Sequence, residues 1–206
     1  MTICIPIGII YKSHGRAYID NRDKIFSIAL SLFAVRGYDA VGVQEIVESA
    51  GLTKPTMYHY FGSKRGLLDA LFTEYGGRLN LSVTGAARYS GDLPKTLEDL
   101  FFTFTSFAKE NHDFYRLMLS LYFAPRDSEA NEAAKSWNEK IFSIIEEMFR
   151  QASLQHGNMK NRQSAYSASF IGTINTYIGM SLNGYLELSD VLVRAAVKQF
   201  MHGIFS

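Results

Sequence analysis

A short polar stretch, residues 54–59, has the side chains that donate hydrogen bonds and neutralise negative charge. Thr53 can cap a helix there, and such a helix tolerates Pro55 in its first turn, where a backbone amide has no partner within the helix. Helical spacing points Met57 inward with Leu52 and Phe61. The outer face then consists of five residues: Lys54, Pro55, Thr56, Tyr58 and His59.

Such an outer face fits a groove of double-stranded DNA. Lys54 can neutralise phosphate or donate to guanine, Thr56 can bond a base or touch a thymine methyl, and the Tyr58 hydroxyl can reach a phosphate oxygen. A single exposed Lys or Thr is usually only solvated surface. The shared outward register therefore carries the prediction. Gly51-Leu52-Thr53 joins this helix to another short one, which is the scale of a helix-turn-helix.

The rest of the chain predicts helices throughout. It has only four prolines, long apolar patterns of period 3.6 and no alternating Val/Thr-rich segments that would form a sheet. Asp20, Thr53 and Ser63 are expected to begin helices, and Gly37 and Gly51 to end them. The expected helices are 21–36, 43–50, 54–60, 64–87, 94–110, 112–123, 128–155, 160–184 and 190–205.

Two consecutive strings, ALSLFAVRGYDAVGVQEIVESAGL and GLTKPTMYHYFGSKRGLLDAL, resemble the TetR family of transcriptional regulators. The similarity covers about residues 21–72. It implies an all-α protein with an N-terminal three-helix DNA-binding domain and a C-terminal helical bundle for effector binding and dimerisation. It also implies that Gln44 lies near base edges, that Lys54, Thr56, Tyr58 and His59 follow the groove, and that Lys64 clamps a phosphate.

The helix beginning at Lys64 favours an anion at its first turn, because unpaired amides and the positive dipole end lie there. Two positions depart from the family's pattern. Gly42 stands where Ser or Thr usually caps a helix, and Arg65-Gly66 stands where acids are common. Two roles remain open for Tyr38, which could contact phosphate or cover the three-helix core. Tyr60 is expected to pack rather than read bases.

Composition and charge divide the chain into three parts. Residues 1–18 are interpreted as a flexible extension, 19–66 as the DNA-binding domain and 67–206 as the effector-binding and dimerisation domain. Residues 1–66 carry a net charge of +3 and the remainder −2, as expected if only the first part faces phosphates. Cys4 is the only cysteine, so a disulfide and a Cys-based zinc site are excluded and a cytoplasmic location is expected. No stretch has the roughly 20 apolar residues of a membrane span.

The bundle is expected to hold a largely apolar or aromatic small molecule within residues 94–180, whose binding releases a repressor from a palindromic operator. The apolar pattern over residues 160–205 predicts two amphipathic helices. These helices are expected to form the interface of a homodimer. The candidate effector residues are mostly aromatic: Phe104, Phe107, Tyr122, Trp137, Phe142, Phe170, Asn175 and Tyr177.

Two other classes of protein fit the sequence less well. An enzyme or metal protein is disfavoured because the five histidines are scattered and no Glu-x-x-His pair occurs; no catalytic residue, metal or cofactor is expected. A ligand-binding or interaction module without DNA activity would not need Lys54, Thr56 and His59 in outward register.

Overall fold

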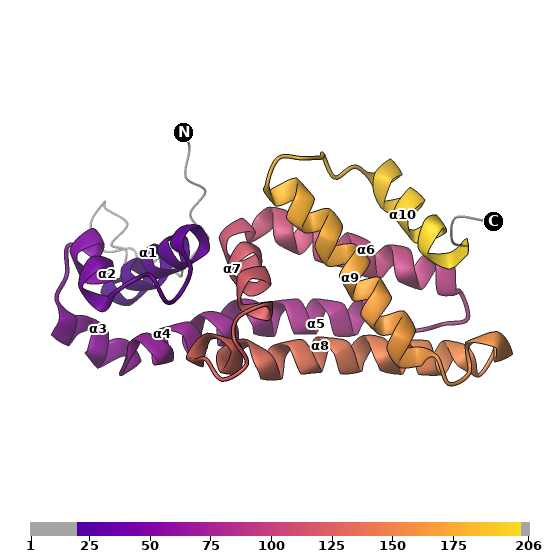
Figure 1. Cartoon of the computed structure of the whole chain (residues 1–206), viewed down its shortest axis with the longest axis horizontal. Coiled ribbons are helices and arrows are strands. Elements are labelled where there is room, and N and C mark those ends of the chain that lie inside the picture. The colour runs from indigo at the N-terminus through magenta and orange to yellow at the C-terminus, as the bar shows by residue number, and fades with distance from the viewer. Residues whose placement is uncertain (1–19, 203–206) are drawn as a thin grey trace, which may run out of the picture.

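The computed structural model describes residues 20–202, and all the regular elements in this range are helical. The all-α prediction is confirmed. The elements in chain order are α1 (Asn21–Arg36), α2 (Val43–Ala50), α3 (Lys54–Phe61), α4 (Lys64–Leu71), η1 (Phe72–Gly76), α5 (Gly77–Ala86), α6 (Leu93–Glu110), α7 (His112–Tyr122), α8 (Glu129–Ser153), η2 (Gly157–Met159), α9 (Gln163–Leu182) and α10 (Asp190–His202) (Figure 1). The expected extension, 1–18, and residues 203–205 lie outside the described range.

Local signals placed most helix ends correctly. The Asp20 carboxylate accepts a hydrogen bond from the Arg22 amide, and the Ser63 hydroxyl accepts one from the Gly66 amide. Gly37 and Gly51 leave their helices at positive φ. The helix predicted over 160–184 is shorter, at 163–182, because Asn161 takes a positive φ and interrupts the chain before it.

The helix expected over 64–87 is not uniform. A π-helical turn, η1, separates α4 from α5. It ends at Gly76, and α5 begins at Gly77; glycine is a poor helix former. The Trp137 ring lies only 3.2 Å from where a Cβ on Gly76 would sit. The wider turn buries Phe72 and Tyr75.

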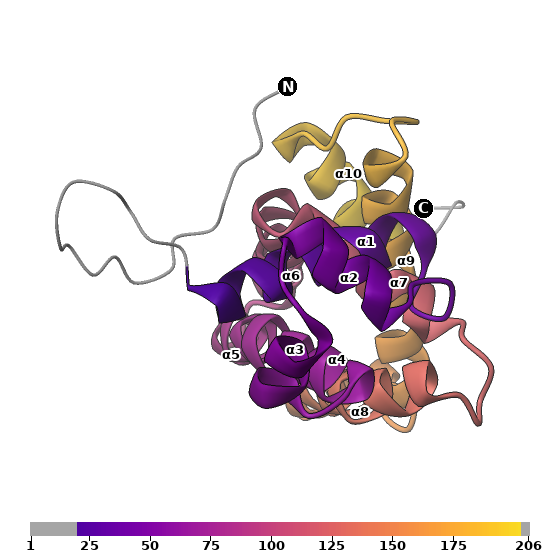
Figure 2. The same ribbon diagram turned by 90° about the vertical axis from the view of Figure 1, so that its left-hand side faces the viewer.

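Figure 1 shows α4, η1 and α5 as one long rod, with α8 running beside it. At one end lie α1, α2 and α3, called here the N-terminal unit. Figure 2, seen from that end, shows α10 on the side away from α4 and α8. Contacts join α8 to α9, and α10 to α6. The remaining helices form the body of the molecule. Within residues 20–202, none of the helices is both long and apolar enough to cross a bilayer.

Helix α1 is buried more widely than one amphipathic stripe predicts. It contacts α7 of the body as well as α2, α3 and α4. Phe26, Leu30 and Ala34 are buried in addition to Ile25, Ala29 and Phe33, whereas Ile28 and Leu32 are only partly buried.

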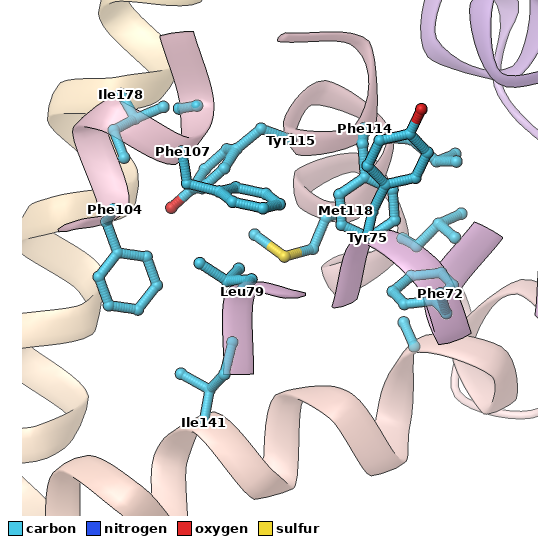
Figure 3. Close-up of a cluster of buried hydrophobic side chains, with 14 of the residues drawn as sticks. Phe72, Tyr75, Leu79, Phe104, Phe107, Phe114, Tyr115, Met118, Ile141 and Ile178 are labelled. Atoms are coloured by element: carbon cyan, nitrogen blue, oxygen red, sulfur yellow. The ribbon is translucent and has the colours of Figure 1, made fainter. Parts of the chain in front are cut away.

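A series of aromatic rings, called here the aromatic column, connects the N-terminal unit to the body. Phe61 of α3 stacks on Phe26 of α1 at 6.3 Å between ring centroids, and Phe26 stacks on Tyr75 at 6.0 Å. Tyr75 stacks on Phe114 of α7 at 5.1 Å. Figure 3 shows Tyr75 and Phe114 side by side in the core, with Phe72 close by. The column fixes the N-terminal unit on the body.

Adjacent glycines in the rod provide a test of the packing at η1. Gly77→Ala should stabilise the protein by about 0.5–1 kcal/mol, because Ala is the better helix former and the new methyl group meets nothing within 4 Å. Gly76→Ala should give a smaller gain or a loss, because its methyl group presses on Trp137. Urea unfolding of both variants measures the difference. Equal stabilisation would contradict the close packing of Trp137 on the π turn.

Candidate nucleic-acid interface

The turn between α2 and α3 has the local geometry of a helix-turn-helix. Gly51 adopts the left-handed conformation at the end of α2. The Thr53 hydroxyl oxygen lies 3.4 Å from the Thr56 amide, from which it accepts, and 2.9 Å from the Thr56 hydroxyl. Ile46 and Met57 are fully buried beneath the two helices. The first helix ends and the second begins on one shared core.

The structure places the predicted groove residues on the outside. Lys54, Pro55, Tyr58 and His59 are exposed, with Tyr58 at 46%, and Thr56 is partly buried. Gln44 is exposed on the first turn of α2, where its amide donates to the Glu48 carboxylate. The outward register has its cause in the burial of Met57. Contact with DNA stays a prediction for each of these residues.

Tyr60 packs, although at the surface. Its ring lies 5.3 Å from the His59 ring and 6.3 Å from the Phe61 ring. Its hydroxyl donates to the Asp20 carboxylate at 3.4 Å. These contacts tie the end of α3 to the start of α1.

Lys64 lies against an aromatic surface. Its ammonium nitrogen is 4.1 Å from the centroid of the Tyr38 ring, a cation–π contact. Partial burial lowers the pKa of Lys64, and the charges of Asp39 and Glu129 oppose that shift. The ring therefore holds this cation at the first turn of α4.

Tyr38 is a lid over the core. It is only 3% exposed, packs on Phe33 at 5.2 Å and donates its hydroxyl to the Glu129 carboxylate at 2.9 Å. Burial first, and then the hydrogen bond to Glu129, raise the pKa of Tyr38 above its ordinary value. Of the two roles left open by the sequence, the structure shows the packing role. The contact with the first residue of α8 could not be read from the sequence.

Arg65 is engaged within the protein. Its guanidinium lies 2.9 Å from the Asp69 carboxylate and 3.5 Å from the Glu132 carboxylate of α8. The hydrogen bond to Asp69 is the largest cause of its raised pKa. The charge that departs from the family's pattern is thus compensated. Gly66 is required by close approach, because a Cβ there would lie 2.0 Å from the Phe61 carbonyl oxygen.

Comparison with known proteins agrees with this geometry. Residues 25–71 match the family model of bacterial regulatory proteins, tetR family. The match covers the N-terminal helix-turn-helix and α4, and in this part the chain is similar to the tetR family.

Two relatives are similar over stretches of different length. The HTH-type transcriptional activator FasR of Mycolicibacterium smegmatis is 27% identical over 129 residues, which cover 61% of this chain and 59% of FasR. The HTH-type transcriptional repressor ComR of Escherichia coli is 38% identical over 64 residues, 31% of this chain and 30% of ComR. The chain thus spans less than two thirds of the length of these relatives.

Solved structures share the fold over nearly the whole chain. The regulator FadR of Bacillus subtilis, in complex with stearoyl-CoA, superimposes with a TM-score of 0.72 at 19% identity, covering 88% of this chain and 98% of FadR. Such low identity shows the fold alone. The tetR-type arrangement of an N-terminal helix-turn-helix and a helical C-terminal domain is confirmed.

The predicted effector residues do not form one group. Phe104, Phe107 and Phe170 are buried in the core, where Figure 3 shows Phe104 and Phe107 near Leu79. Asn175 accepts a hydrogen bond from the Tyr115 hydroxyl at 2.7 Å.

Other members of the set lie at the edges of the core. Tyr177 packs on Phe101 at 5.9 Å, Trp137 stacks on Phe72 at 6.5 Å, and Phe142 is partly buried. Tyr122 is 50% exposed at the end of α7.

Two cavities open at the surface of the body. One, of about 400 Å³, lies between α9 and α10 and is lined by Thr173, Thr176, Tyr177, Ala196, Gln199 and Phe200. The other, of about 240 Å³, is lined by Ala108, Lys109, His112, Ile178, Ser181, Leu182 and Leu188. Tyr177 is the one predicted effector residue among these linings. The described residues hold no group of three His, Cys, Asp or Glu side chains suited to a metal ion.

The start of α2 offers a test of local capping. Gly42 provides no side-chain bond there, has extended backbone and has open space around it. Gly42→Ser should stabilise the protein by a few tenths of a kcal/mol, because the hydroxyl can accept from a free amide of the first turn. The control, Gly37→Ser, should destabilise it by about 1 kcal/mol, because Gly37 has a φ of 82°. Thermal unfolding of both variants measures the change in stability. Destabilisation by Gly42→Ser would contradict the assignment of Gly42 as an N-cap without a side-chain hydrogen bond.

Proposed function

We propose that this chain is an operator-binding transcriptional repressor that a small, largely apolar effector releases from DNA. The outward row on α3, backed by the buried Met57, carries the proposal. Residues 19–66 would form the DNA-binding domain and 67–206 the effector-binding and dimerisation domain, working in the cytoplasm.

Two kinds of side chain would contact DNA, those that enter the groove and one that binds phosphate. Lys54, Thr56, Tyr58 and His59 would follow the major groove from α3, and Gln44 would approach from α2; Pro55 would lie against the same surface. Lys64 would neutralise a phosphate, since its ammonium group is held at the positive end of α4 by the Tyr38 ring. Arg65 would contribute little, because its charge is paired with Asp69 and Glu132.

The effector is proposed to bind in the body, within residues 94–180. The many buried aromatic rings there support an apolar molecule, because an apolar lining favours an apolar ligand. The candidate residues are those predicted from the sequence, except Tyr122, whose exposure excludes it from an enclosed site. Release of DNA by strongly anionic metabolites alone would contradict this proposal.

Dimerisation is proposed through α9 and α10. On α9 an exposed row at helical spacing is small or apolar: Ala168, Gly172, Thr176 and Met180. On α10, Val191 and Ala195 are exposed in the same way. A second copy covering both rows by two-fold symmetry would present two α3 helices about 34–36 Å apart, as a palindromic operator requires.

Binding titrations across several salt concentrations, on DNA from upstream of its own gene and on a scrambled sequence, test the DNA contacts. Lys64→Ala should reduce the salt slope by about 1 and keep sequence preference, because phosphate contacts are the same on all sequences. Thr56→Ala should weaken preferred DNA by about 1–3 kcal/mol with little change in slope. Lys54→Ala should show both effects. If Lys64→Ala changed neither slope nor affinity, the proposed docking would be wrong.

Sedimentation tests the dimer. The wild-type protein should be a dimer at micromolar concentration, and Ala168→Glu should shift it towards monomer, because two like charges would meet across the two-fold axis. Leu81→Glu, at an exposed apolar position on α5, is the matched control and should leave the dimer intact. A monomeric wild-type protein, or equal effects of the two variants, would contradict the interface.

A further inference from the structure

Asn80 of α5 is a buried amide without a partner. It is only 3% exposed, and neither its side-chain nitrogen nor its side-chain oxygen finds a hydrogen bond within the described part of the chain. Burial of an unpaired polar group opposes folding, so such groups are rare in native proteins and each needs a physical reason.

The other buried polar side chains do not behave in this way. Each donates to a backbone carbonyl of the preceding turn: Thr96 to Asp92, Thr105 to Phe102, Asn111 to Phe107 and Ser167 to Gln163. Asn111 shows that an asparagine in this protein can pair with its own helix. Asn80 makes no such hydrogen bond to a carbonyl of its own helix.

The π turn explains why Asn80 faces inward. At 100° per residue, an unbroken α-helix would place Asn80 about 120° around the axis from the buried Leu68. A turn that closes one residue later removes about one residue of rotation, which brings Asn80 to about 20° from Leu68. The turn at η1 therefore rotates an amide into the core, and π turns inserted in α-helices are frequent at functional sites.

The surroundings of α5 are apolar. It packs against α6 and α8, and all the buried residues of α8 in the described range are apolar. The buried polar residues of α6, Thr96 and Thr105, already use their hydroxyls within their own helix. A water molecule held in a core needs two to four polar partners, and among the described residues no other buried side-chain nitrogen or oxygen lacks a hydrogen bond.

We propose that Asn80 is the polar anchor of the effector site. The ligand would carry a group that both accepts and donates, a primary or secondary amide or a hydroxyl, on an otherwise apolar body. Asn80 would be its specificity-determining residue. This rests on the proposed function and extends the proposed effector site from residues 94–180 to α5, because the molecule bound here would be the effector.

Trp137 reports on this site without DNA. It is the only tryptophan of the chain and lies on Gly76, one helical turn before Asn80. Titrating hexanamide and n-hexane into the full-length protein while following Trp137 fluorescence gives their dissociation constants. Asn80→Leu keeps the volume but removes the amide, and Thr96→Val is the control at a buried polar residue that is already paired.

In the wild-type protein hexanamide should bind. Asn80→Leu should weaken hexanamide about tenfold or more relative to n-hexane, while Thr96→Val should leave that ratio unchanged. Asn80→Leu should also raise the urea midpoint of the ligand-free protein, because it removes an unpaired buried amide.

An unchanged ratio, an absence of hexanamide binding, or a lower urea midpoint for Asn80→Leu would each overturn the assignment. The last result would mean that the amide already has a partner, a bound water included. Because these measurements contain no DNA, their outcome does not depend on whether the protein binds an operator.

Discussion

The position of Tyr75 between Phe26 and Phe114 is the contact on which the rest of the arrangement depends. Phe26 belongs to the central helix of the N-terminal unit, and Phe114 to a helix of the body. Each stacked pair contributes about 0.5–1.5 kcal/mol beyond the burial of its area. Since Phe26 also stacks on Phe61 at the end of α3, the orientation of the groove-facing helix is fixed relative to the core. A ligand that shifted the π turn would act directly on this joint.

A second, polar joint lies at the start of α8. Tyr38 and Arg65 of the N-terminal segments bond to Glu129 and Glu132. The Lys64 ammonium group lies on the Tyr38 ring, and Tyr38 is hydrogen-bonded to Glu129 of the body. Tyr38 therefore connects the proposed phosphate contact to the body. The three rings of the aromatic joint, Phe26, Tyr75 and Phe114, are buried. The carboxylates of the polar joint, Glu129 and Glu132, are exposed, so salt weakens their electrostatic interactions. Trp137 lies on the same helix, α8, as Glu129 and Glu132, and its ring stacks on Phe72 of the π turn.

Sequence reasoning predicted what depends on local patterns. The caps at Asp20, Thr53 and Ser63, the burial of Met57 and the outward register of α3 all follow from spacing and residue type. It failed where tertiary contacts decide. Glu129, the partner of Tyr38, and Glu132, the second partner of Arg65, lie more than sixty residues away, and the contact of α1 with α7 joins segments far apart in the chain. The π turn left only a faint signal, Gly76-Gly77, and Asn80 looked like an ordinary polar position in a regular helix.

Selection of bound sequences from a random pool of double-stranded DNA shows whether α3 reads a two-fold operator. The wild-type protein should enrich an inverted repeat whose half-site centres are one helical turn apart, about 10–10.5 base pairs, or a multiple of it. Thr56→Ala should enrich a repeat with relaxed preference at one position in each half-site. Recovery of unselected sequences by the wild-type protein, or of a single unrepeated site, would contradict the account.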